Sequence, residues 1–189
     1  AKKTNNEMST FADLQKLGMR DVVVFACDLN TKSVKEFSFA STPNVPIAEA
    51  ARASMSIPLF FEAWQFPASV PDDHLYVDGG TAYNYPVSAF DTAGINPNTL
   101  GLYLTNEDAQ LVDSGLKYDH VFKYVEAVFE IVLASQRLDF KKDPSDQART
   151  VKVNDFGISG TNFGITQADK DKLYKSGQDS VTKFFAAKA

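Results

Sequence analysis

The apolar and polar positions along the chain follow two different periods, which predicts strands and helices in turn. Short apolar or alternating runs predict strands at residues 22–26, 34–39, 75–77, 100–104 and 151–153. Helical spacing or helix-favouring composition predicts helices at residues 11–17, 47–55, 86–93, 119–138 and from Thr166 onward. Strands that alternate with helices predict an α/β fold with three layers, a mostly parallel sheet and helices on both faces. Residues 1–9 form a polar lead, and residues 10–189 are expected to form one domain.

The most regular helical pattern lies at residues 119–138. Val121, Val125, Val128 and Val132 recur at spacings of four, three and four, which is one face of a helix. An amphipathic helix of this kind either packs on a protein core or lies on a membrane. Its polar face is mixed in sign rather than basic, which favours burial in the protein.

Composition excludes some functions. The chain has 189 residues, 44% of them hydrophobic, and a formal net charge of −5, which argues against binding to nucleic acid. Cys27 is the only cysteine, so no disulfide forms within the chain, and its apolar surroundings predict a buried thiol. Fifteen Phe and seven Tyr suit an apolar ligand groove, and suit an ordinary core better.

Nothing in the sequence predicts insertion into a membrane. No run approaches the roughly 18 apolar residues of a transmembrane helix, so a soluble protein is expected. Residues 1–10 are polar and lack the apolar core of a signal peptide. That observation says little about export if the natural N-terminus lies upstream, as we expect below.

The most informative segment follows the predicted strand at 75–77. Asp78, Gly79 and Gly80 are completed by Asn84 and Pro86. An aspartate at a strand end serves as a general base if burial raises its pKa above the usual value of about 3.9. The glycines allow a positive φ or a close approach of another segment, and Asn84 is placed to hydrogen-bond the turn. An Asp-Gly pair alone is more often an ordinary turn, but the longer pattern is more specific.

The pattern Asp78-Gly79-Gly80-x-x-x-Asn84-x-Pro86 resembles the patatin-like phospholipase family. Three further segments resemble the same family in the same order: residues 10–29, the Arg-Ala-Ser-x-x-x-Pro stretch at 52–58 with Phe60 and Phe61 after it, and residues 164–177. Together they extend from about Thr10 to about Phe185. Four segments in the family's order make coincidence an unsatisfactory explanation.

The resemblance implies a lipid acyl hydrolase with an α/β fold and a Ser–Asp dyad that uses no histidine. Asp78 is then the catalytic aspartate, and residues 79, 80, 84 and 86 support its turn. The family's nucleophilic serine lies upstream in a Gly-x-Ser-x-Gly elbow, and a glycine-rich loop forms the oxyanion hole. No metal or cofactor is implied. The implied substrate is a phospholipid or related acyl lipid, met at a transient membrane surface.

The sequence departs from the family at the nucleophile. No Gly-x-Ser-x-Gly occurs in the 189 residues, and the nearest string, residues 157–160, lies downstream of the acid. We therefore expect the C-terminal part of a patatin-like catalytic domain, whose partner is an N-terminal segment carrying the serine, on a separate chain or a missing part of the same protein. Two alternatives stay open. One is a catalytically inactive patatin-like interaction module, and the other is an unrelated α/β binding domain.

The remaining candidates are weaker. His74 and His120 lie far apart and are expected in exposed positions, which does not suit a zinc site. Asp28 is either a second carboxylate of the site or part of a turn, and the turn is favoured. Ser54 lacks the flanking glycines of a nucleophile elbow. An apolar wall for the acyl chain is predicted at Phe60, Phe61 and Trp64.

Overall fold

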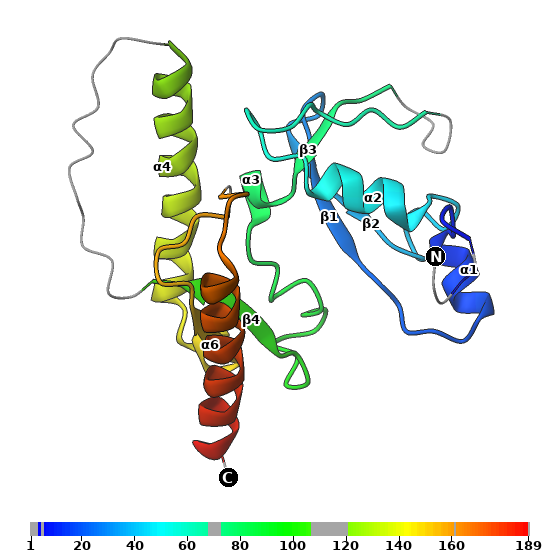
Figure 1. Ribbon diagram of the computed structural model, residues 1–189. Coiled ribbons are helices and arrows are strands. Elements are labelled where there is room, and N and C mark those ends of the chain that lie inside the picture. Colours follow the sequence, from blue (N-terminus) through cyan, green and yellow to red (C-terminus); the bar gives the residue numbers. More distant parts are fainter. Residues whose placement is uncertain (1–3, 5, 68–72, 107–120, 161, 189) are drawn as a thin grey trace. The chain divides into compact units, whose positions relative to one another are not determined.

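The computed structural model describes residues 4, 6–67, 73–106, 121–160 and 162–188 of the chain (Figure 1). Helices and small sheets alternate along it, so the predicted mixed α/β class is confirmed. Contacts divide the chain into two compact units, which are described separately. The first unit comprises Ala1–Asn84 and Val125–Gln136, and the second comprises Tyr85–Tyr124 and Arg137–Ala189.

The first unit contains a three-stranded sheet in the order β2-β1-β3. Its strands are β1 (Val24–Asp28), β2 (Ser33–Phe37) and β3 (Tyr76–Asp78), and β1 pairs antiparallel with both neighbours. The prediction of a mostly parallel sheet is not confirmed here. A turn of only four residues joins β1 to β2, and so short a connection allows an antiparallel hairpin but no parallel crossover.

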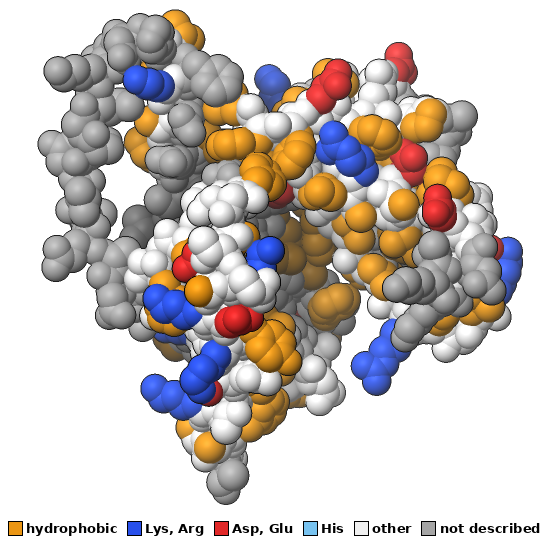
Figure 2. All heavy atoms as spheres, in the orientation of Figure 1, with side chains coloured by type: hydrophobic (Ala, Val, Ile, Leu, Met, Phe, Trp, Pro, Cys, Tyr) orange, Lys and Arg blue, Asp and Glu red, His pale blue; other side chains and the backbone are white. Residues whose placement is uncertain are grey.

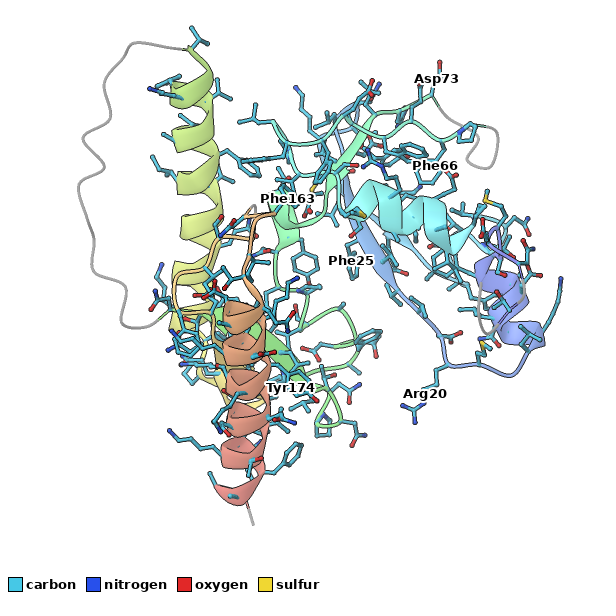
Figure 3. The ribbon with its side chains drawn as sticks, viewed as in Figure 1. Arg20, Phe25, Phe66, Asp73, Phe163 and Tyr174 are labelled. Carbon is cyan, nitrogen blue, oxygen red and sulfur yellow. The ribbon has the colours of Figure 1, made fainter. Side chains whose placement is uncertain are left out.

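Aromatic and small side chains together form the core of this unit. The helix α2 (Ile47–Ser54) packs on β1 and β3 with Ala50 and Ala53 fully buried, because alanine allows a helix to approach a sheet closely. The other buried members of the cluster are Phe11, Ala26, Phe37, Val45, Phe66 and Tyr76. The rings of Phe66, Phe37 and Tyr76 pack against one another, mainly edge to face (Figure 3).

Short helices begin at local signals that the sequence shows. Helix α1 (Phe11–Lys16) starts after Thr10, whose hydroxyl accepts from the backbone N–H of Asp13 while the Asp13 carboxylate accepts from the N–H of Thr10. This reciprocal pair is a capping box, and it satisfies two N–H groups that the first turn leaves open. Phe11 is buried beneath it.

The second unit is built on a parallel strand pair. Strand β4 (Gly101–Thr105) pairs with β5 (Thr150–Asn154), which follows the short helix α5 (Pro144–Ala148). The rings of Tyr85, Tyr103 and Phe140 pack against one another at centroid distances of 4.5–5.2 Å. Helix α6 (Gln167–Ala186) packs on β5 and begins after Thr166, as predicted. The Thr166 hydroxyl accepts from the N–H of Asp169 and so caps the helix.

One predicted helix is wrong. Residues 86–93 form successive turns, whereas one helical turn occurs earlier, as α3 (Gly80–Tyr83). The N–H groups of Ala89 and Asp91 donate three residues back, to Pro86 and Ser88, and not four residues back as in an α-helix. The Asp91 carboxylate is also held by the guanidinium of Arg149 at 2.5 and 2.7 Å, which fixes the turn in place of a helix.

Helix α4 (Val121–Lys142) is present as predicted, but its apolar stripe is not buried. Val121, Val125, Val128 and Val132 are 40–79% exposed, and the prediction of burial is therefore wrong for these four side chains. Among the α4 side chains that the structure describes, Phe140 near the C-terminal end is buried. Residues 119 and 120, including His120, lie outside the described residues.

Candidate functional site around Asp78

Asp78 is the last residue of β3 and lies opposite Ala26 of β1. Its backbone N–H donates to the carbonyl oxygen of Ser56 at 2.9 Å, so the Arg-Ala-Ser-x-x-x-Pro stretch supports the strand end from the other side. The side chain is half-buried, and its Oδ1 accepts a hydrogen bond from the N–H of Gly80 at 2.7 Å. The carboxylate is therefore held in a defined orientation by its own turn.

Burial raises the pKa of the Asp78 carboxyl, because desolvation penalises its charged form. The hydrogen bond from Gly80 opposes this effect by stabilising the carboxylate, and burial remains the larger influence. A carboxyl with a raised pKa is a better proton acceptor than an ordinary surface aspartate. This is the electrostatic property that the sequence argument requires of a general base.

The two glycines after Asp78 have different roles. A Cβ at Gly79 would overlap the backbone oxygen of Phe25 in β1, and a backbone atom cannot move aside as the end of a side chain can. A Cβ at Gly80 would instead meet side-chain oxygens, those of Asn84 and Asp78, at 2.8 and 2.9 Å. The expected close approach is therefore present. A positive φ is not, since Gly79 has φ −59° and begins α3 in a helical conformation.

A residue that the sequence analysis missed closes this turn. The side-chain amide of Gln136, on α4, bonds the backbone of Gly80, Thr81 and Asn84. Asn84 ends α3 and was expected to fix the turn with its side chain, yet the bond that ties it to α4 is made by its backbone N–H. Gln136 lies 52 residues from Asn84 in sequence, and no local pattern marks it.

Serine and cysteine side chains beneath the turn are structural. Ser56 is fully buried, donates its hydroxyl to the carbonyl of Arg52 and accepts from the guanidinium of Arg52 at 2.6 Å. Ser54, the serine considered from the sequence, is the last residue of α2. The thiol of Cys27 lies 3.6 Å from the carbonyl oxygen of Gly79, and burial raises its pKa. The predicted burial of Cys27 is confirmed.

Asp28 and Asp78 do not point to the same sheet edge. Strands β1 and β3 are antiparallel, so their C-terminal ends lie at opposite ends of the pair. Asp28 ends β1 opposite Tyr76, and Asp78 ends β3 opposite Ala26. The predicted turn at Asp28 is confirmed, since its Oδ1 accepts from the N–H groups of Asn30 and Thr31. Its Oδ2 lies 2.7 Å from Nδ1 of His74, a pairing that the sequence did not reveal. These bonds help to lower the pKa of Asp28 despite its desolvation.

The aromatic stretch after α2 divides between core and surface. Phe66 belongs to the core, and Trp64 packs partly against that core while its indole N–H donates to Glu49 at 3.0 Å. The Arg52 guanidinium lies over the rings of Phe61 and Trp64, at 5.7 and 5.2 Å from their centroids. Phe60 is 43% exposed. In the view of Figure 2, hydrophobic side chains lie among charged ones on the surface of the first unit.

Two further properties bear on function. Across the described ranges, no three His, Cys, Asp or Glu side chains gather as metal ligands would. In the same part of the chain, no helix is long and apolar enough to cross a lipid bilayer.

A family model matches the first part of the chain. Residues 2–91, which include the Asp78 turn, match the family model described as patatin-like phospholipase. The resemblance inferred from the motifs is thereby confirmed over this part of the chain. The match ends at residue 91, so it does not extend to α4, β5 or α6.

Two individual proteins resemble nearly the whole chain. An uncharacterised protein of Acanthamoeba polyphaga mimivirus, R571, is 27% identical over an alignment of 188 residues, which covers 95% of this chain and 58% of that protein. The crystal structure of VipD from Legionella pneumophila superposes on 95% of this chain and 35% of its own, with a TM-score of 0.63 and 16% identity. At that identity the likeness concerns the fold. The chain therefore spans little more than half of one relative and about a third of the other.

Proposed function

We propose that residues 10–189 form the C-terminal part of a patatin-like catalytic domain, a serine esterase of the phospholipase A type that hydrolyses acyl lipids. Asp78 is its general base. The observation that carries the proposal is the Asp78 carboxyl itself. It is half-buried, oriented by the N–H of Gly80, raised in pKa, and located within the segment that matches the patatin-like family model.

The proposed reaction proceeds through an acyl-enzyme. Asp78 takes the proton of a serine hydroxyl as the serine oxygen bonds to the ester carbonyl carbon. The ester C–O bond then breaks, and the leaving alcohol takes the proton from Asp78. Water attacks the acyl-serine, its proton passes through Asp78 back to the serine, and the fatty acid leaves. Backbone N–H groups that stabilise the oxyanion typically contribute about 3–4 kcal/mol to such reactions.

The serine and the oxyanion hole are proposed to lie on another segment, since the 189 residues contain no Gly-x-Ser-x-Gly. The nearest string places Ser159 in an exposed turn, and residues 155–166 separate β5 from α6 there. A nucleophile elbow needs a sharp turn directly from strand to helix. Ser159 is therefore not proposed as the nucleophile, and the partner is a segment with Gly-x-Ser-x-Gly, on this polypeptide or a second one.

Asp78→Asn in the complete protein tests the proposal. Esterase activity on a phospholipid in mixed micelles should fall at least a thousandfold, because an amide cannot accept the serine proton. Asp171→Asn, on the exposed part of α6, is the matched control and should retain activity. Circular dichroism and thermal unfolding of both variants show whether the fold is intact. An active, folded Asp78→Asn protein contradicts the assignment.

A catalytically inactive interaction module is the second candidate, and the missing nucleophile motif is the observation that favours it. Intact-mass analysis of the purified protein separates the two. A single species of 20.8 kDa without esterase activity supports the module, and a bound polypeptide carrying Gly-x-Ser-x-Gly supports the hydrolase.

The acyl chain is proposed to lie along Phe60, Phe61 and Trp64, where a transient membrane surface delivers the lipid. Partial exposure of Phe60 supports this role, whereas the bond of Trp64 to Glu49 gives that ring a structural role as well. Phe60→Ala in the complete protein should reduce hydrolysis of long-chain esters more than that of short-chain esters. Equal losses on both would count against the apolar wall.

A further inference from the structure

The side chain of Gln136 bonds both ends of the single helical turn that follows Asp78. Its Nε2 donates to the carbonyl oxygens of Gly80 and Thr81, at 3.0 and 3.2 Å. Its Oε1 accepts from the backbone N–H of Asn84 at 2.7 Å. All of these groups belong to the first unit. One amide thus satisfies three backbone groups within five consecutive residues.

The turn needs this support because it is short. Helix α3 has four residues, so most of its N–H and C=O groups lack partners within the helix. Its own bonds within the turn run from the N–H groups of Ala82 and Tyr83 to the carbonyl of Gly79. A helix of this length has almost no stability of its own in water. Contacts from outside the turn therefore decide its geometry.

Gly80 connects the hydrogen bonds of Gln136 to the Asp78 carboxylate. Its N–H donates to Oδ1 of Asp78, and its carbonyl accepts from Nε2 of Gln136. Both peptide groups of one residue are thus fixed, one by the aspartate and the other by α4. If the Gln136 bonds are lost, Gly80 is free to rotate and its N–H no longer stays directed at Oδ1.

The side-chain amide of Gln136 supplies both kinds of group that the turn requires. The two carbonyls require a donor and the Asn84 N–H requires an acceptor, so a carboxylate serves only half of the arrangement and an apolar side chain serves none of it. Asparagine carries the same amide on a side chain that is one methylene shorter, which places the amide farther from these three groups. These requirements separate a specific function for Gln136 from general packing.

We propose that Gln136 is a positioning residue for the Asp78 base, acting through the backbone of α3. This inference rests on the proposed function, because it assigns a role in the reaction of Asp78. Gln136 itself does not touch the reacting atoms. It sets the orientation of the carboxylate, to which effective proton transfer is sensitive.

The first test needs no activity and uses the complete protein. In Gln136→Met, hydrogen exchange at the Asn84 amide should accelerate about tenfold, and the NMR-titrated pKa of Asp78 should rise, because the bond from Gly80 that lowers it is loosened. Gln178→Met, on an exposed part of α6, is the matched control and should change neither value. An unchanged Asp78 pKa in Gln136→Met overturns the proposal.

The second test uses the complete protein and separates this proposal from the proposed function. Gln136→Met and Gln136→Glu should lower kcat about tenfold or more with little change in KM, since the hydrogen bonds of Gln136 to α3 do not take part in substrate binding. Wild-type kcat in both variants, with Asp78→Asn inactive, overturns the role of Gln136 and leaves the hydrolase intact. Retained activity in Asp78→Asn overturns the hydrolase mechanism instead. Gln136→Glu retains an oxygen that accepts from the Asn84 N–H, so this variant should disturb the fold less than Gln136→Met does.

Discussion

The backbone N–H of Gly80 lies 2.7 Å from Oδ1 of Asp78 and donates a hydrogen bond to it. Gly79, by contrast, lies against the backbone of β1 at Phe25. Two adjacent residues of the same type therefore serve the carboxylate and the sheet separately. This division makes their effects on stability and on activity separable.

Gly79→Ala should mainly reduce stability, and Gly80→Ala should mainly reduce activity. The new methyl at residue 79 meets the Phe25 backbone oxygen, so the free energy of unfolding should fall by about 1–3 kcal/mol. At residue 80 the methyl meets the ends of two side chains, which move aside at lower cost but take the Asp78 carboxylate with them. Urea unfolding and ester hydrolysis by the complete protein check the pair. Equal effects of both changes on both measurements would contradict the division.

Asp78→Asn should stabilise the protein at neutral pH. The folded pKa of Asp78 is raised above the unfolded value of about 3.9, so the fold favours the protonated form. The contribution of Asp78 is fully present below the unfolded pKa and is lost as the pH rises through the folded pKa. The variant should therefore unfold at higher urea than the wild type at pH 7, and the difference should vanish below about pH 4. The same urea midpoint for both proteins at pH 7 argues against a raised pKa.

Gly101→Ala and Gly177→Ala should have opposite effects on stability. A Cβ at Gly101 would overlap the hydroxyl oxygen of Tyr85, which is hydrogen-bonded to the Thr150 hydroxyl. Overpacking of this kind costs about 1–3 kcal/mol. A Cβ at Gly177 meets nothing within 4 Å inside α6, so alanine should stabilise that helix by about 0.5–1 kcal/mol. Thermal unfolding of the two variants gives the sign of each.

Acid should weaken the second unit through Asp91. The hydrogen bonds from Arg149, and then that from the N–H of Asn96, lower the pKa of Asp91 to about 2. A lowered folded pKa gives stability that is present above the unfolded pKa near 4 and is lost as the pH falls toward 2. The urea midpoint of the wild type should decrease over this interval, and Asp91→Asn should flatten the decrease. Asp179→Asn, at the exposed pair with Lys175, is the control and should leave the slope unchanged.

Local sequence signals predicted the parts of the fold that depend on neighbouring residues. Thr10 and Thr166 each precede an aspartate by three residues, a spacing typical of a helix N-terminus, and a helix begins after each of them. Asp78 was found in the same way, because its strand, glycines and asparagine are consecutive. The direction of strand pairing was not predictable from an apolar run, which indicates burial but says nothing of the partner strand. The antiparallel pairing of β1 with β3 consequently separated Asp28 from Asp78.

Contacts between distant segments explain the remaining differences. His74 meets Asp28 across 46 residues, and Gln136 meets the turn at 80–84 across more than 50. Neither side chain lies in a periodic pattern that would mark it. The burial of the valine stripe on α4 was not predictable for a different reason. Its spacing establishes that one helix face is apolar but does not show whether another surface covers that face. The four valines of that face are exposed in the described structure.

The thiol of Cys27 offers a way to time the opening of the turn. It is the only sulfhydryl in the chain, it is 5% exposed, and it lies against the carbonyl of the residue that follows Asp78. A thiol reagent reaches it only when β1 and the turn separate, so the labelling rate under native conditions depends on this separation. The chain therefore already contains a reporter next to its proposed base, and the labelling rate of this thiol reports how readily the turn opens.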